Sequence, residues 1–209
     1  MTHLTLPDLV DTPSSIVTDD GRRLDVPRAM TVDEFMAFPW PERERWELLE
    51  GVPVMSPAPA PRHQLLVFEI GYFLRNLHPD WCIVPGIDVT PSGHGSYVCP
   101  DLVVLDEIGP MERPTLRTPK LAVEVLSPSN RRNDLATKFW LYQRVGYPEY
   151  WIADPATAKL TIYLLDETAS PHAYRESLPD ADGFAASRLL AVSVRLSEPG
   201  PLYIIEHRS

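Results

Sequence analysis

Apolar residues at helical spacing predict a helix in the first half of this chain. Positions 66, 70, 73 and 77 are all apolar, which is the spacing of one face of a helix. Pro61 suits the first turn of that helix, and Pro79 ends it. Upstream, Thr31 and Glu34 form the T-x-x-E pattern of a capping box, which predicts a short helix through Phe38.

Apolar runs of strand length occupy much of the remaining chain. Residues 45–57 read RWELLEGVPVMSP, in which Glu50 and Gly51 separate two apolar flanks, as in a β-hairpin. A further helix is expected from about residue 131 to 144, with Gly146 at its C-cap. Other apolar runs predict strands over residues 81–90, 97–106, 121–127, 149–154 and 159–165.

The order of these elements predicts an α/β fold. Between residues 62 and 154 the order is helix, strand, strand, strand, helix, strand, which fits a mixed sheet whose last strand is reached through a helical crossover. Residues 1–30 are polar without a sustained period, and we expect a loose arm or a segment that docks on a partner subunit. Residues 31–209 should form a single domain, ending in two or three short strands.

Composition narrows the class of protein. The 209 residues can bury one sizeable core, and a formal net charge of −10 counts against a large nucleic-acid footprint. No apolar run approaches the ~20 residues needed to cross a bilayer, and no signal peptide is recognisable, so we expect a cytoplasmic protein. Cys82 and Cys99 are expected to be free thiols. Short groups of arginines, typical of solvated surface, occur at positions 22, 23, 28, 43, 45, 131 and 132.

Two acidic residues interrupt apolar strands. Asp101 begins the run DLVVL, and Glu124 stands inside LAVEVL. An ionised carboxylate stripped of water costs several kcal/mol unless it is paired or bound to a metal. Because side chains alternate along strands, Asp101 and Glu124 can converge at one end of the sheet, where they would suit Mg²⁺. Alternatively, Asp101 caps a turn after Pro100 and Glu124 has a structural role.

Six short segments of the chain resemble the Uma2 family of the restriction-endonuclease-like PD-(D/E)XK superfamily. They are ELLEGVPVMSPAP, PRH, PDLVVL, VEVLSPS, DLATKFWLY and GYPEYWIAD, within residues 31–165. The resemblance implies a core at 62–154 with the superfamily's fold, and a metal, Mg²⁺ or Mn²⁺, bound by Asp101 and Glu124. The superfamily's pattern also places a lysine two residues after the glutamate, where this chain has Leu126.

Lys138, on the predicted helix after the glutamate strand, is the substitute that we expect for the missing lysine. Asp134, Lys138 and Tyr142 are spaced by four and share one helix face, so an ordinary ion pair between Asp134 and Lys138 is the alternative. Lys120 has the right parity but lies over 10 Å from Glu124 along a strand.

Glu47 and His63 are supporting candidates for the site. Glu47 lies in the predicted hairpin and could be a third acid near the metal. His63 shares the apolar helix face, where a hydrogen-bonded structural histidine is the alternative.

These residues predict a Mg²⁺-dependent endonuclease that hydrolyses DNA phosphodiester bonds. Asp101 and Glu124 would bind the metal, Lys138 would assist the attacking water, and Glu47 and His63 would support them. A homodimer is expected by analogy with nucleases of this fold. The alternatives are an inactive nucleic-acid- or protein-binding module of the same fold and a hydrolase of smaller phosphoesters.

Overall fold

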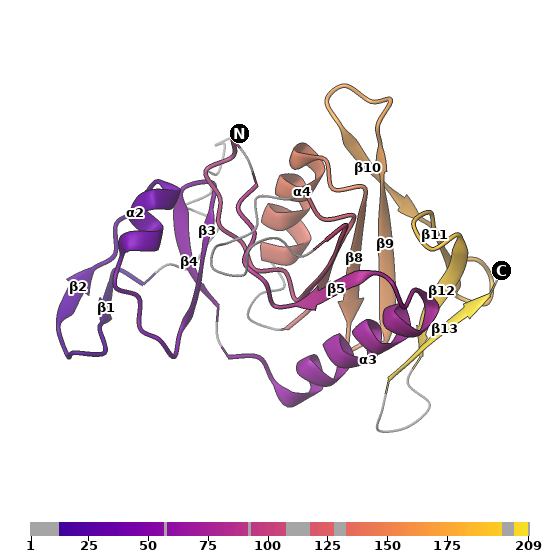
Figure 1. Cartoon of the computed structure of the whole chain (residues 1–209), viewed down its shortest axis with the longest axis horizontal. Coiled ribbons are helices and arrows are strands. Elements are labelled where there is room, and N and C mark those ends of the chain that lie inside the picture. Colours follow the sequence, from indigo (N-terminus) through magenta and orange to yellow (C-terminus); the bar gives the residue numbers. More distant parts are fainter. Residues whose placement is uncertain are drawn as a thin grey trace.

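The computed structural model describes residues 13–56, 58–91, 93–107, 118–127, 133–197 and 203–208, with the backbone only for residues 133 and 134. Figure 1 shows two small hairpins with a short helix on one side, a larger sheet with two helices in the middle, and a small sheet on the other side. Within the described residues, we find no helix with the length and apolar character that a membrane span requires.

The central sheet has six strands in the order β10-β9-β8-β7-β6-β5. Strands β7 and β8 run parallel, and every other neighbouring pair in this sheet is antiparallel. The predicted mixed α/β class is therefore confirmed. The strands are β5 (Cys82–Pro85), β6 (Leu102–Leu105), β7 (Leu121–Val125), β8 (Glu149–Asp154), β9 (Lys159–Asp166) and β10 (Ala173–Ser177).

Two of these strands are shorter than the sequence predicts. The expected strand over 81–90 is paired in the sheet only as β5, and the strand expected over 97–106 only as β6. Gly86 turns the chain with a positive φ of 60°, and Pro100 lacks the N–H that a ladder needs. Beyond these strands, an isolated bridge joins Val89 to Val98. Because β6 begins only at Leu102, Asp101 lies just before the strand.

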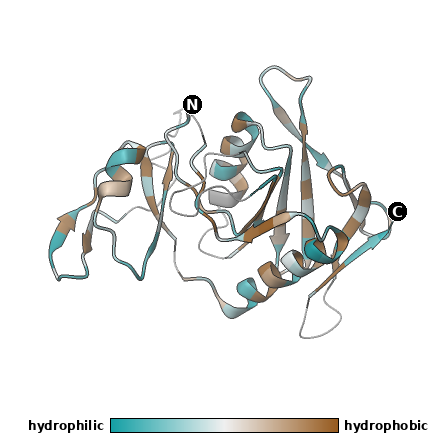
Figure 2. Ribbon diagram, in the orientation of Figure 1, coloured by the Kyte–Doolittle hydropathy of each residue, from teal (hydrophilic) through white to brown (hydrophobic). Residues whose placement is uncertain are grey.

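Helix α3 (Pro61–Leu77) packs on one face of the sheet, as its predicted stripe requires. Its residues Leu66 and Ile70 join Val123 and Val125 of β7 in one buried cluster. The helix ends at His78, whose N–H donates to the Leu74 carbonyl at 2.9 Å. In Figure 2 hydrophobic residues colour the central strands, while hydrophobic and hydrophilic residues alternate along α3. Helix α3 therefore covers one face of the sheet.

The opposite face of the sheet is covered by helix α4 (Phe139–Val145). Leu141 and Tyr142 of this helix cluster with Ala122 and Leu126. A π-helical segment, η1 (Asn133–Lys138), precedes α4, so the described part of the helix expected over 131–144 has two helical types. Residues 131 and 132 lie outside the described residues. The predicted C-cap is confirmed, because Gly146 has the left-handed φ of 80°.

The N-terminal elements pack against one another beside the core. Helix α2 (Val32–Ala37) has the predicted capping box: Thr31 Oγ1 accepts from the Glu34 amide, and the Thr31 amide donates to Glu34 Oε2. Strands β1 (Ser15–Val17) and β2 (Arg23–Asp25) form a hairpin that the polar sequence did not predict. Ile16 and Val26 are buried in one cluster with Phe35, so this part of the expected arm packs on the protein. Residues 1–12 of the expected arm lie outside the described residues.

The predicted hairpin at 45–57 consists of β3 (Arg45–Leu49) and β4 (Val52–Ser56). Its turn has positive φ at both Glu50 and Gly51, 52° and 84°. At the other end of the chain, β11 (Ala185–Ser187), β12 (Val192–Ser197) and β13 (Ile204–Arg208) form a three-stranded sheet that shares the buried cluster of α3.

Candidate active site

Asp101 stands at the end of β6, opposite Glu124 on β7. Leu102 pairs with Val123 in the antiparallel register, and one further residue brings Asp101 and Glu124 face to face. Asp101 Oδ2 accepts hydrogen bonds from the Val125 amide at 2.8 Å and from His63 Nε2 at 3.0 Å. Both side chains are buried. The carboxylate is therefore held by the sheet and by the first turn of α3 together.

The environment of Asp101 favours its ionised form. Burial by itself raises the pKa of this carboxyl. The hydrogen bond and charge of His63, the charge of Lys138 and the Val125 amide outweigh burial and leave the pKa below its ordinary value of 3.8. Asp101 is therefore an acceptor and a negative charge at neutral pH, which are the properties of a cation ligand.

Glu124 lies deeper, with 1% of its surface exposed. Its Oε1 accepts from the Lys138 amine at 3.0 Å and from the Tyr142 hydroxyl at 2.8 Å. Burial, followed by the charge of Glu124, raises the pKa of Tyr142 well above its ordinary value, so the hydroxyl keeps its proton and remains a donor. Lys138 and Tyr142 thus reach the same carboxylate from η1 and α4, as their spacing of four predicted.

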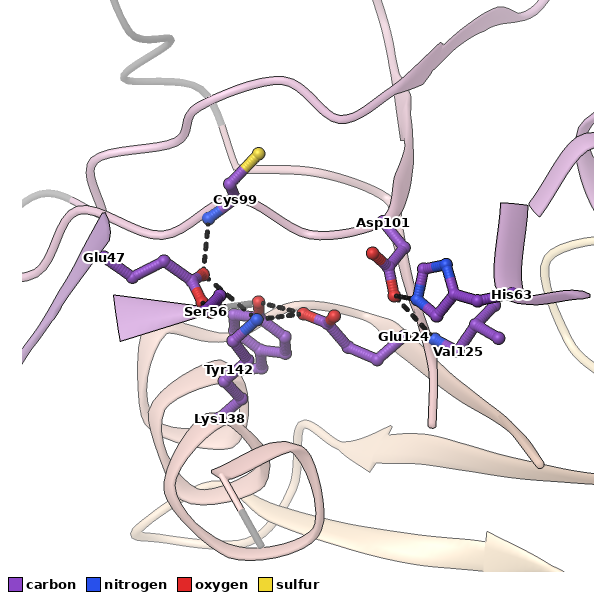
Figure 3. A network of polar contacts seen from close by, with 9 residues as sticks. All are labelled: Glu47, Ser56, His63, Cys99, Asp101, Glu124, Val125, Lys138 and Tyr142. Atoms are coloured by element: carbon purple, nitrogen blue, oxygen red, sulfur yellow. Dashed lines mark hydrogen bonds and ion pairs between the residues drawn. The ribbon is translucent and has the colours of Figure 1, made fainter. Parts of the chain in front are cut away.

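Lys138 also contacts a second acid. Its amine lies 3.0 Å from Glu47 Oε1 as well as 3.0 Å from Glu124 Oε1. Glu47 is in turn bound by the Cys99 amide at 2.8 Å and by the Ser56 hydroxyl at 3.1 Å. Figure 3 shows Glu124 between two groups, with Asp101 and His63 on one side and Lys138 and Glu47 on the other.

The structure brings together all five residues singled out in the sequence: Glu47, His63, Asp101, Glu124 and Lys138. All five also line one small cavity. The residues that line it are Arg45, Glu47, Ser56, Pro59, His63, Cys99, Asp101, Glu124, Ser127 and Lys138. The cavity holds about 30 Å³, which is room for one or two water-sized occupants. The side chain of Asp134, the alternative partner of Lys138, lies outside the described residues.

The other positions weighed in the sequence lie away from the cavity. Leu126 is buried in the cluster beneath α4. Its side chain is not among those that line the cavity. Lys120 is 43% exposed and pairs with Asp106 at 2.5 Å.

Arg45 and Tyr142 are the site residues that the sequence reasoning assigned elsewhere. Arg45 was read as solvated surface, yet it lines the cavity. Tyr142, which the sequence analysis placed on the helix face of Lys138 without a role, is buried, and its hydroxyl donates to Glu124. Strand parity with Glu47 was the signal for Arg45, and the i, i+4 relation to Lys138 was the signal for Tyr142.

The donor set fits a small hard cation. Asp101 and Glu124 offer carboxylate oxygens, and no described residue donates a hydrogen bond to Asp101 Oδ1. Mg²⁺ is commonly held by one or two carboxylates and keeps several waters. Within the described residues no group of three or more His, Cys, Asp or Glu side chains is arranged to hold a metal, so a closed, all-protein cage is not formed there.

Comparison with known proteins places this chain in a family. A model of the Uma2 family, described as "Putative restriction endonuclease", matches residues 32–196. The chain belongs to the Uma2 family. All five residues of the predicted site lie within the matched span of this nuclease family.

A solved structure supports the fold of this Uma2 protein. It is the crystal structure of "a putative nuclease belonging to DUF820" from Anabaena variabilis, with a TM-score of 0.62 and 18% sequence identity. The similarity covers 78% of this chain and 91% of that chain. At this identity the likeness establishes the fold alone. A comparison with curated proteins finds no match.

Proposed function

We propose that this Uma2 protein is a metal-dependent endonuclease that hydrolyses phosphodiester bonds in DNA. The observation that carries the proposal is the meeting of Asp101, Glu124 and Lys138 in one cavity. Asp101 directly precedes β6, Glu124 lies on β7 and Lys138 ends η1. Membership in a nuclease family supports the same reaction class.

Asp101 and Glu124 would hold Mg²⁺ or Mn²⁺ in this reaction. When bound, such an ion lowers the pKa of a coordinated water and neutralises charge on the phosphoryl oxygens. His63 and the Val125 amide fix the rotamer of Asp101 through Oδ2 and leave Oδ1 directed elsewhere. His63 is in this role a positioning residue.

Lys138 supplies the positive charge that the family pattern expects two residues after the glutamate. Its amine contacts Glu124 directly, so it can position a water beside that carboxylate and stabilise negative charge in the transition state. Glu47 and Tyr142 hold Lys138 and Glu124 in this arrangement. Because its oxygens already accept from Cys99, Ser56 and Lys138, Glu47 acts as a positioning residue and not as a third metal ligand.

A plasmid-nicking assay with Mg²⁺ or Mn²⁺ tests the proposal. Wild-type protein should cleave, and Asp101→Asn or Glu124→Gln should lose about 100-fold or more, since a bound metal contributes several kcal/mol. Asp106→Asn is the matched control, because Asp106 directly follows β6 but is exposed and pairs with Lys120. Metal binding should be measured in parallel by calorimetry. Absence of both cleavage and metal binding would favour the non-catalytic module.

A further inference from the structure

Arg45 is directed at the cavity by the register of the β3–β4 hairpin. Arg45 pairs with Ser56 and Glu47 with Val54, so Arg45 and Glu47 are two residues apart on one strand and share a face. Both line the cavity that holds the candidate metal ligands. Arg45 is exposed to solvent whereas Glu47 is buried, which places the guanidinium at the mouth and the carboxylate inside.

The guanidinium of Arg45 also packs against the turn after β5. A Cβ built on Gly86 would lie only 3.1 Å from Arg45 Nη2, and Gly86 has a positive φ of 60°. The Gly86 amide donates to the Asp101 carbonyl at 3.0 Å. A glycine at this turn therefore leaves the space in which Arg45 lies beside the segment that carries Asp101.

Arg45 forms no hydrogen bond or ion pair with any residue that the structure describes. The neighbouring acids have other partners: Glu47 binds Lys138, and Asp101 binds His63.

The electrostatic surroundings keep Arg45 cationic. Burial lowers the pKa of Arg45, but Cys99 and the acids Glu47, Asp101 and Asp88 outweigh burial and raise it. An exposed arginine that has no ion-pair partner among the described residues therefore lies next to an acidic cavity.

We propose that Arg45 binds a phosphodiester group of the nucleic-acid substrate at the mouth of the cavity. This inference rests on the proposed nuclease function and deepens it by naming a substrate-binding residue. A guanidinium can donate two parallel hydrogen bonds to phosphate oxygens, which fixes orientation as well as position. Buried carboxylates line the cavity, and the chain has a formal net charge of −10. Both repel a phosphate anion, so a cation at the mouth of the cavity would offset this repulsion.

The experiment measures binding of a fluorescent DNA duplex by anisotropy at 50 to 200 mM salt, a range chosen from the known salt sensitivity of such contacts. Ca²⁺ serves as the divalent ion, and a gel verifies that the DNA stays intact. The variants are Arg45→Gln, which keeps much of the stem, Arg45→Lys, which keeps the charge, and Arg43→Gln. The last is the matched control, because Arg43 is exposed on the same segment and does not line the cavity. Circular dichroism checks that each variant is folded.

One lost phosphate contact has a defined signature. Arg45→Gln should lower the slope of log K against log[salt] by about 0.9 and weaken binding about tenfold near 0.1 M salt. Arg45→Lys should keep the wild-type slope, and Arg43→Gln should keep both slope and affinity. Unchanged binding by Arg45→Gln, or an equal loss in Arg43→Gln, overturns the role of Arg45 while wild-type cleavage stands. A wild type that neither binds nor cleaves DNA overturns the nuclease function with it.

Discussion

At the scale of single residues, the position of Lys138 links stability to chemistry. Its amine is the only described cation that ion-pairs with both Glu47 and Glu124, and all three side chains are at most 5% exposed. Removing one partner of a buried ionic group leaves uncompensated charge, which costs much more than losing a surface pair. The residue that would assist hydrolysis should therefore also hold the fold.

Lys138→Met should destabilise the metal-free protein by about 3 kcal/mol or more, because two buried carboxylates lose their common cation. Urea unfolding in EDTA measures the change. Lys120→Met is the matched control, since Lys120 is 43% exposed and its pair with Asp106 should contribute at most about 1 kcal/mol. Equal losses in the two variants would contradict the central position of Lys138.

The lowered pKa of Asp101 predicts a pH dependence with a definite sign. A carboxyl whose folded pKa lies below its unfolded value stabilises the fold above the unfolded value, near 3.8, and loses that contribution as the pH falls through the lowered folded value. The difference in unfolding free energy between wild type and Asp101→Asn, measured in EDTA, should thus be largest near neutral pH and shrink below about pH 4. A difference that grows on acidification would contradict this.

The acidic residues of the site could be predicted because an ionised carboxylate inside an apolar strand needs a partner or a metal ion. Asp101 and Glu124 were conspicuous inside runs of valine and leucine, and the helix period placed Lys138 near Tyr142. The place of Arg45 at the cavity could not be predicted, because arginines are common on surfaces. Alternation along a strand also does not tell which face of the strand turns inward. That choice depends on how the hairpin docks, which is a long-range contact.

At the scale of elements, the β3–β4 hairpin delivers two site residues and depends on its turn. Gly51 has a φ of 84°, and its missing Cβ would meet the Met30 carbonyl oxygen at 3.3 Å. The Gly51 amide also donates to the Gly95 carbonyl at 2.9 Å. The turn is therefore specified both by its own conformation and by its neighbours.

Gly51→Ala should destabilise the protein by more than the roughly 1–2 kcal/mol expected from left-handed strain alone. Gly93→Ala is the control, because Gly93 has a similar φ of 78° but nothing within 4 Å of its would-be Cβ. Thermal unfolding compares the two variants. If Gly93→Ala costs as much as Gly51→Ala, the contact with Met30 carries no weight.

Most elements followed from local patterns, and the exceptions have local or tertiary causes. The capping box, the α3 stripe and the turn at Gly51 each combine residue type with spacing, so they could be predicted. The β1–β2 hairpin could not, because its few apolar residues become informative only when Ile16 and Val26 meet the α2 region. The π-helical turn of η1 has no comparable signature in the sequence.

At the scale of the whole molecule, the predicted homodimer can be tested by the mass of the protein in solution. Phe68 and Tyr72 on α3 are 63% and 57% exposed, which is unusual for large aromatic side chains. If the proposed nuclease cleaves both strands of a duplex, two sites in one assembly would serve that reaction. Light scattering coupled to gel filtration should therefore give about twice the chain mass of 23.6 kDa. A single-chain mass at micromolar concentration would contradict the dimer.

The seating of the hairpin on the rest of the protein has a consequence for when the enzyme can act. Leu48 and Tyr97 exchange amide hydrogen bonds of 2.7 and 2.8 Å, which join β3 to the stretch before β6. If this junction opens, Arg45 and Glu47 depart together. The proposed phosphate contact of Arg45 and the ion pair between Glu47 and Lys138 would then be lost in the same event. The proposed nuclease would therefore act only while this hairpin is docked on the stretch before β6.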